Sequence, residues 1–222
     1  MYLAKQSIAV FKKELSSEFK TRSSLSAVAL FILTTVTISA LAIAGQHPST
    51  EVYSGLLWII MFFSAMTGLS KVFVSESERG TSFILQLTVQ SSSVYFGKLL
   101  YNTILSLAIN LFSVLLYLVF INSNSIAMPL EFALVTTLAA LGLSASTTII
   151  SALISRAGSK NSLFAVLSFP IVLPLIILGL DLTIAAFSGS DENWINGFLQ
   201  LIAYSGILIV LSYMLFDFVW ED

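Results

Sequence analysis

The chain of 222 residues contains no cysteine, one histidine and few charged side chains, which make up 10% of it. Without cysteine it has no disulfide framework, no thiolate nucleophile and no cysteine-ligated metal. Soluble domains are about 25% charged, so this composition excludes an ordinary soluble enzyme and the basic surface of a nucleic-acid-binding protein. Hydrophobic residues make up 57% of the chain. We therefore expect an all-α integral membrane protein with almost no soluble mass.

Long windows without charge locate the membrane spans. A helix needs about 20 apolar residues to cross a hydrocarbon core of about 30 Å. The windows predict one transmembrane domain over 1–222, with six spans at about 24–44, 52–74, 99–121, 130–154, 163–180 and 195–219. The stretch 80–97 also lacks charge, but its serine, threonine and glutamine side chains are too polar for a lipid-facing helix. We do not expect it to span the membrane.

The basic residues predict the orientation of these spans. All ten lysines and arginines fall before the first span, at the end of the second span or between the second and third, or between the fourth and fifth. The positive-inside rule places such segments in the cytoplasm. Both termini are therefore expected on the cytoplasmic side.

The first 22 residues have the pattern of an amphipathic helix. Ile8, Phe11, Leu15 and Phe19 recur at spacings of three and four, which places them on one helical face. This pattern predicts an interfacial helix that lies in the inner headgroup layer with its lysines toward anionic lipid. A solvated basic start that only enforces topology is the alternative.

The segment between the second and third spans could hold a cytoplasmic element. After a polar opening, in which Gly80 interrupts the arriving helix, Phe83, Ile84 and Leu87 predict a short amphipathic helix. Such a helix would offer its apolar side chains to a soluble partner, or would fold back onto the membrane surface. The candidate partner-contact residues are Glu76, Glu78, Arg79, Gly80, Phe83, Ile84 and Leu87.

Polar and helix-breaking residues inside the spans suggest structural roles. Pro170 and Pro174 remove two backbone donors and are expected to kink the fifth span. Kinks of this kind often mark substrate paths in transporters, but kinks that serve only helix packing are at least as common. Asn102 and Asn110 in the third span are expected to form interhelical hydrogen bonds.

Residues for catalysis are missing from the predicted spans. No window has a carboxylate, lysine, arginine or histidine near its middle, and no nucleotide-binding or hydrolase motif occurs. We therefore predict no catalytic site, no bound cofactor and no metal site, and energy must come from a partner. His47, in an outer loop, could serve as an axial heme ligand, although an ordinary loop residue is the simpler interpretation.

Three stretches, in this order and spacing, resemble CcmB, the ABC-2-type heme exporter permease subunit of cytochrome c maturation. They are Phe11-Lys12-Lys13-Glu14-Leu15 through Arg22, Gly55-Leu56-Leu57-Trp58 through Gly80 to Gly97-Lys98, and Arg156 through Pro170 to Pro174. The resemblance implies a homodimeric or paired permease in the bacterial inner membrane, with ATP bound and hydrolysed by a separate subunit. Residues 76–90 would be the coupling segment that contacts this ATPase. Heme would be the possible substrate, and heme-handling membrane proteins and a periplasmic heme chaperone would be further partners.

Two other functions fit the same layout of spans. An ABC-2 permease for a lipid, a glycan or a drug would have the same helices and the same coupling segment. A membrane assembly scaffold that transports nothing would also have the spans, but its residues 76–90 would bind no ATPase.

Overall fold

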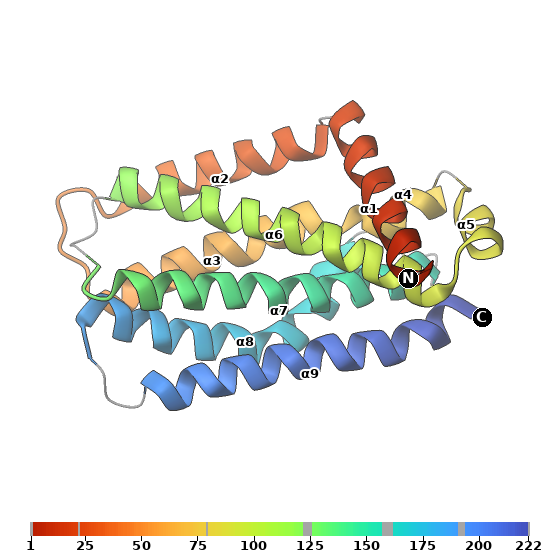
Figure 1. Ribbon diagram of the computed structural model, residues 1–222. Coiled ribbons are helices and arrows are strands. Elements are labelled where there is room, and N and C mark those ends of the chain that lie inside the picture. The colour runs from red at the N-terminus through yellow and green to blue at the C-terminus, as the bar shows by residue number, and fades with distance from the viewer. Residues whose placement is uncertain are drawn as a thin grey trace.

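A computed structural model describes residues 2–21, 23–78, 80–121, 126–156, 162–190 and 194–221. These residues form helices joined by short connections and contain no strand, which confirms the expected all-α class (Figure 1). The helices are α1 (Tyr2–Thr21), α2 (Ser23–Ala42), α3 (Thr50–Leu69), α4 (Lys71–Glu78), α5 (Ser82–Thr88), α6 (Ser91–Ile121), α7 (Pro129–Arg156), α8 (Ser162–Ser188) and α9 (Trp194–Glu221).

The six predicted spans are confirmed as helices that are long and apolar enough to cross a membrane. They cover Ser24–Ala42, Thr50–Glu76, Ser91–Ile121, Pro129–Ser155, Val166–Ser188 and Trp194–Trp220. The fifth span, in α8, runs past its predicted end at residue 180, and the third span, in α6, begins at Ser91 instead of residue 99.

The early start of α6 has a clear cause. Ser91 donates a hydrogen bond to Asp217 at 2.8 Å, Ser92 shares one with Tyr213 at 3.2 Å, and Ser93 donates one to Gln6 at 3.1 Å. Because protein groups satisfy these hydroxyls, the polarity of the turn does not prevent a helix. The expectation that residues 91–97 lie outside the helix was therefore wrong.

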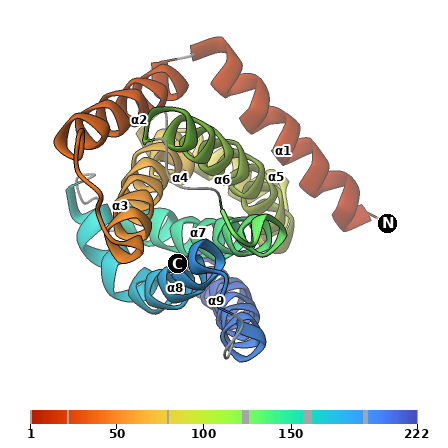
Figure 2. The ribbon, with the colours of Figure 1, turned by 90° about the vertical axis from the view of Figure 1, so that its left-hand side faces the viewer.

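Helix α7 is the centre of the bundle. It contacts α3, α4, α6, α8 and α9, and it lies in the middle when the molecule is viewed along its length (Figure 2). Its small residues permit this close packing, since a Cβ placed on Gly142 would lie only 2.6 Å from Leu175 of α8. From α9, the hydroxyl of Ser212 donates to the carbonyl oxygen of Ala145 at 3.1 Å.

Helices α3 and α8 are joined by a tryptophan in the interior. The indole Nε1 of Trp58 donates to the hydroxyl of Thr183 at 3.0 Å, and both residues are buried. The ring lies against Gly179, where a Cβ would come within 2.1 Å of two ring carbons. Only glycine leaves room for the indole at this point of α8.

Helix α1 packs obliquely against α6 near the end of the bundle that also holds α4 and α5 (Figure 1). We call this end, which holds Lys13 and Lys98, the basic end. The predicted helix is confirmed, but its buried residues are Ser7, Val10 and Glu14, whereas Ile8 and Phe19 are exposed. The expected apolar stripe is therefore only part of the packed face, because the helix packs at Gly97 and buries a carboxylate there.

Candidate functional site

Four charged side chains from three helices meet at the basic end. Lys98 Nζ of α6 lies 3.0 Å from Oε1 of Glu14 in α1 and 3.0 Å from Oε2 of Glu76 in α4. Lys13 Nζ lies 3.3 Å from the same Glu14 oxygen and pairs with Oε1 of Glu76. We call these four residues the ion network; its two positive and two negative charges cancel.

Lys98 is the buried centre of the ion network. Its side chain is 0% exposed, and Nζ also donates to the carbonyl oxygen of Val72 at 2.5 Å. The Phe73 ring lies with its centroid 4.4 Å from the same nitrogen, which favours the cation. A buried ammonium group is tolerated only when it is paired and hydrogen-bonded in this way.

Lys13 lies at the edge of the network. Burial alone would lower the pKa of Lys13, but its hydrogen bond to Glu76 and the charges of Glu14 and Glu76 outweigh burial. The pKa of Lys13 is therefore raised above its usual 10.5, and the side chain stays charged at physiological pH.

The sequence pattern predicts that residues 76–90 contact a partner from Glu76 onward, but the start of this segment is not an exposed surface. Glu76 was expected to face a partner, but it is buried in α4 and paired with both lysines of the ion network. The side chains of Glu78 and Arg79 lie outside the described part of the chain. Gly80 is exposed with φ +67°, and Thr81 N–H donates to the Glu76 carbonyl, which ends α4 and turns the chain into α5.

Helix α5 has the predicted exposed apolar face. Phe83, Ile84 and Leu87 are 65%, 61% and 72% exposed, and we call these three residues the α5 face. The opposite side of the segment is fixed to the bundle, since Leu85 and Val89 pack against the core. Gln86 also donates to the carbonyl oxygen of Trp220 in α9 at 2.7 Å.

A line of buried polar residues continues from the ion network along α6. Its members recur every three or four residues and therefore share one helical face: Lys98, Asn102, Ser106, Asn110, Ser113 and Tyr117. Asn102 donates to Thr148 of α7 at 2.7 Å, which confirms its predicted interhelical hydrogen bond. The same prediction for Asn110 was wrong, because neither amide atom has a hydrogen-bond partner among the described residues.

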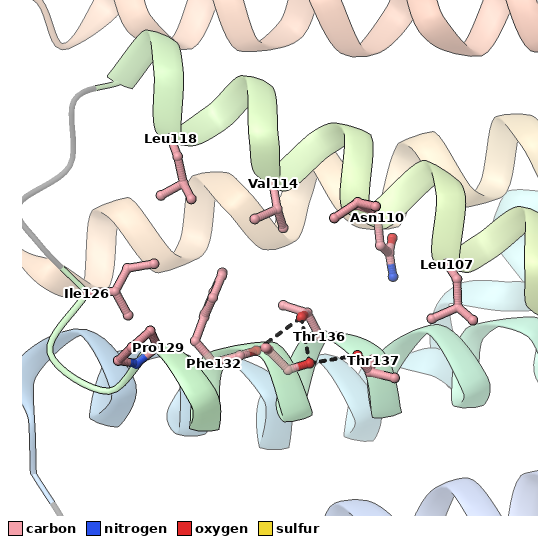
Figure 3. Close-up of a pocket in the computed structure, with 11 residues that line it drawn as sticks. Leu107, Asn110, Val114, Leu118, Ile126, Pro129, Phe132, Thr136 and Thr137 are labelled. Carbon is pink, nitrogen blue, oxygen red and sulfur yellow. Dashed lines mark hydrogen bonds between the residues drawn. The ribbon is translucent and has the colours of Figure 1, made fainter.

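Asn110 lies beside a hollow between α6 and α7. The hollow has a volume of about 410 Å³, and we call it the α6/α7 groove. Leu107, Leu111, Val114 and Leu118 line it from α6; Ile126 and Pro129, Phe132, Ala133, Thr136 and Thr137 of α7 complete it. Figure 3 shows the Asn110 amide directed from α6 toward α7.

His47 and the two prolines occupy separate parts of the fold. His47 is exposed in the loop after α2 and lines a pocket of about 370 Å³ with Tyr53 and Phe120. Among the described residues, no group of three histidines or carboxylates could hold a metal ion. The assignment of His47 as a heme contact stays a prediction.

Pro170 and Pro174 lie inside α8, which is one continuous helix from Ser162 to Ser188. Next to them, the hydroxyl of Tyr204 in α9 donates to the carbonyl oxygen of Ile171 at 2.6 Å. A neighbouring helix thus donates a hydrogen bond to the backbone of α8 between its two prolines.

A family model described as CcmB protein matches residues 5–218, nearly the whole chain. This chain belongs to the CcmB family. No curated protein sequence matches it. CcmB-family membership and the six apolar helices identify a multi-pass membrane protein, and the family supports a heme exporter permease subunit of cytochrome c maturation. The matched residues include the ion network, α5 and the α6/α7 groove.

In this CcmB-family chain, the ion network was the feature that sequence reasoning missed. Glu14, Gly97 and Lys98 all lie in the stretches that resemble CcmB, but Lys13 was interpreted as facing anionic lipid and Lys98 only as a marker of topology. The four-residue spacing of Lys98, Asn102, Ser106 and Asn110 was the available signal, because it places all four on one face of a helix that must be buried.

Proposed function

We propose that this permease subunit is driven by a separate ATP-binding subunit that docks on the α5 face and transmits its movement through the ion network. The observation that carries the proposal is the α5 face itself: three large apolar side chains lie exposed on a short helix whose other side is anchored to α9. Exposed apolar clusters of this kind are characteristic of contact sites for partners.

The ion network links this face to the rest of the bundle. Helix α5 follows α4 directly, through Gly80 and Thr81, and Glu76 of α4 is paired with Lys98 of α6. Glu14 joins α1 to the same lysine. A displacement of α5 therefore reaches α1 and α6 together, because separating any of these helices would leave a buried charge without a partner.

The proposal places the basic end in the cytoplasm of a bacterial inner membrane, where an ATPase would find it. Eight of the ten basic residues of the sequence then lie on that side of the six spans, and Lys71 and Lys98 lie near the cytoplasmic ends of two spans, as the positive-inside rule requires. A reporter that works only in the cytoplasm should be active when it is fused after Asp222. Activity of a reporter that works only on the outer side would contradict this orientation.

The family membership supports the remaining partners. We propose that ATP binds to the partner subunit and that a second permease chain completes the transporter, as a homodimer or a pair. Heme is the possible substrate, passed between heme-handling membrane proteins and a periplasmic heme chaperone. This chain would bind no cofactor of its own.

The docking proposal is tested by placing a charge on the α5 face. Phe83→Asp or Leu87→Asp should release the co-purifying ATPase subunit, because a charge buried in an apolar contact costs several kcal/mol. Both side chains are exposed in the isolated subunit, so its own thermal stability should not change. Gln90→Asp, just beyond α5, is the matched control and should retain the ATPase. Retention of the ATPase with normal activity in both variants would contradict docking on α5.

The biological role is tested by deleting the gene. Loss of covalent c-type cytochromes with b-type cytochromes intact is the expected result. Normal c-type heme staining would exclude a role in cytochrome c maturation, and it would favour a permease for another substrate or a scaffold.

A further inference from the structure

A hollow between α8 and α9 contains a carboxylate inside a membrane span. The hollow has a volume of about 370 Å³, and we call it the α8/α9 pocket. Asp181 of α8 lines it together with two amide side chains of α9, Asn196 and Gln200. All three residues are exposed, and none of them forms a hydrogen bond or an ion pair within the described part of the chain. The charge of Asp181 is therefore accessible to a ligand.

Asp181 lies well inside the membrane-length part of α8. The sequence pattern ends the fifth span at residue 180, which would leave Asp181 at the membrane surface, but the span runs from Val166 to Ser188. Ser188 lies at the end of the bundle opposite the basic end, which we call the outer end (Figure 1). Asp181 is seven residues before Ser188, or about 10 Å along the helix axis. An aspartate side chain is too short to reach the headgroup layer from there.

The start of α9 brings its amide side chains to the level of Asp181. Gln200 lies six residues after Trp194, the first residue of α9, which is about 9 Å along the axis. The two helices are in contact here, because a Cβ on Gly197 would lie 3.1 Å from Leu182. Trp194 lines the same pocket, and tryptophan is typical of the membrane–water interface. The pocket therefore extends from that interface into the outer half of the span.

A carboxylate at this depth requires a counter-ion, because charged groups inside a membrane are costly and are almost always paired. This chain has none to offer at the outer end. Its sequence contains no lysine or arginine after Lys160, and the connections at the outer end have one basic side chain, His47, which lines a different pocket. The cation must therefore come from another molecule.

Two sources of a donor fit the pocket poorly. The ammonium group of a phospholipid lies in the headgroup layer, about 10 Å or more outside Asp181. A second copy packed on this face would add its own Asp181 and only the neutral amides of Asn196 and Gln200. Two carboxylates without a counter-ion would then share one interface, which is costly in a low dielectric. A lysine or arginine on another polypeptide has neither disadvantage, since its long stem lies along apolar surface and its charge is opposite.

We propose that the α8/α9 pocket receives a lysine or arginine side chain from a transmembrane helix of another membrane protein. The cation pairs with the carboxylate of Asp181, and the amide oxygens of Asn196 and Gln200 accept further hydrogen bonds from it. This assignment does not rest on the proposed docking of an ATPase, because the α5 face lies at the other end of the bundle (Figure 1).

The test uses the absence of cysteine from the chain. Ala185→Cys places a thiol in the α8/α9 pocket, and Leu178→Cys provides a second position there. Leu111→Cys, on the exposed surface of α6, is the control. Each variant is reconstituted in phosphatidylcholine vesicles with a dilute synthetic polyleucine transmembrane peptide flanked by tryptophans. The peptide carries lysine or methionine at the depth of Asp181 and one cysteine in an adjoining turn, and the disulfide yield after mild oxidation is measured.

The lysine peptide should cross-link at Ala185→Cys and Leu178→Cys with a yield roughly tenfold above the methionine peptide, the ratio that an interaction of about 1.4 kcal/mol gives. Asp181→Asn, which keeps the shape and removes the charge, should abolish this preference, and Leu111→Cys should show none. Equal yields for the two peptides, or a preference that survives Asp181→Asn, would overturn the proposal.

Two further outcomes would assign the pocket to another occupant and would also overturn the proposal. One is cross-linking of the pocket thiol to a second copy in the absence of peptide. The other is loss of the preference when phosphatidylethanolamine replaces part of the phosphatidylcholine, since a lipid amine would then be the better ligand. None of these measurements requires the ATPase, so failure here leaves the proposed function untouched.

Discussion

Lys98 Nζ lies 3.0 Å from Glu76 Oε2 and 3.0 Å from Glu14 Oε1, so one buried ammonium group in α6 joins α4 and the N-terminal helix α1. These contacts come from residues as far as 84 positions apart in sequence. The charges attract strongly because Lys98 is excluded from solvent, and they are costly to separate for the same reason.

Lys98→Met should destabilise the subunit strongly. Removing the buried ammonium leaves two carboxylates with only Lys13, and breaking a buried ion pair typically costs about 3–5 kcal/mol. The free energy of unfolding in detergent measures the loss. Lys13→Met is the matched control, since the Lys13 side chain is 47% exposed and should cost clearly less.

Adding Glu76→Gln to Lys98→Met should restore part of this stability, because the double variant is neutral again. A double-mutant cycle with these two changes measures the coupling between the residues. Additive losses would show that the two charges act independently, contrary to the geometry.

Gly97→Ala should loosen the contact between α1 and α6. A Cβ at Gly97 would lie 2.7 Å from the Ser7 carbonyl oxygen and 2.7 Å from the Val10 Cβ, and the backbone oxygen cannot move away without shifting α1. In a Val10→Cys background, maleimide labelling of this buried position should become faster. Gly55→Ala is the control, since a Cβ there meets nothing within 4 Å. Unchanged labelling in the Gly97 variant would contradict the close contact.

The fold was largely predictable because lipid penalises charge, so the gaps between charged residues mark the spans directly. The same reasoning could not find the ion network. Glu76 and Lys98 stand at the ends of predicted spans, where water normally solvates them, and only the packing of α1 across α6 removes that water. The α5 face was predictable because its exposure follows from local amphipathic spacing, whereas the unpaired state of Asn110 depends on how far α6 and α7 separate.

Gly179→Ala should displace the Trp58 ring and break its hydrogen bond to Thr183. The added Cβ would overlap two ring carbons at 2.1 Å, and a fused ring in a packed interior has no room to rotate. Overpacking of this kind costs about 1–3 kcal/mol. Thermal unfolding followed by tryptophan fluorescence measures the effect, and Gly206→Ala, where a Cβ meets nothing within 4 Å, should leave it unchanged.

Asn102→Leu and Asn110→Leu make the same chemical change on the same face of α6, yet they should have opposite effects on the isolated subunit. Asn102→Leu removes the 2.7 Å hydrogen bond to Thr148, which is worth about 0.5–2 kcal/mol inside a membrane protein. Asn110→Leu removes an amide that has no partner and replaces it with an apolar group of similar volume, so stability should stay equal or rise. Unfolding of both variants in the same detergent provides the comparison. A loss at Asn110 as large as that at Asn102 would mean that the isolated chain already satisfies this amide.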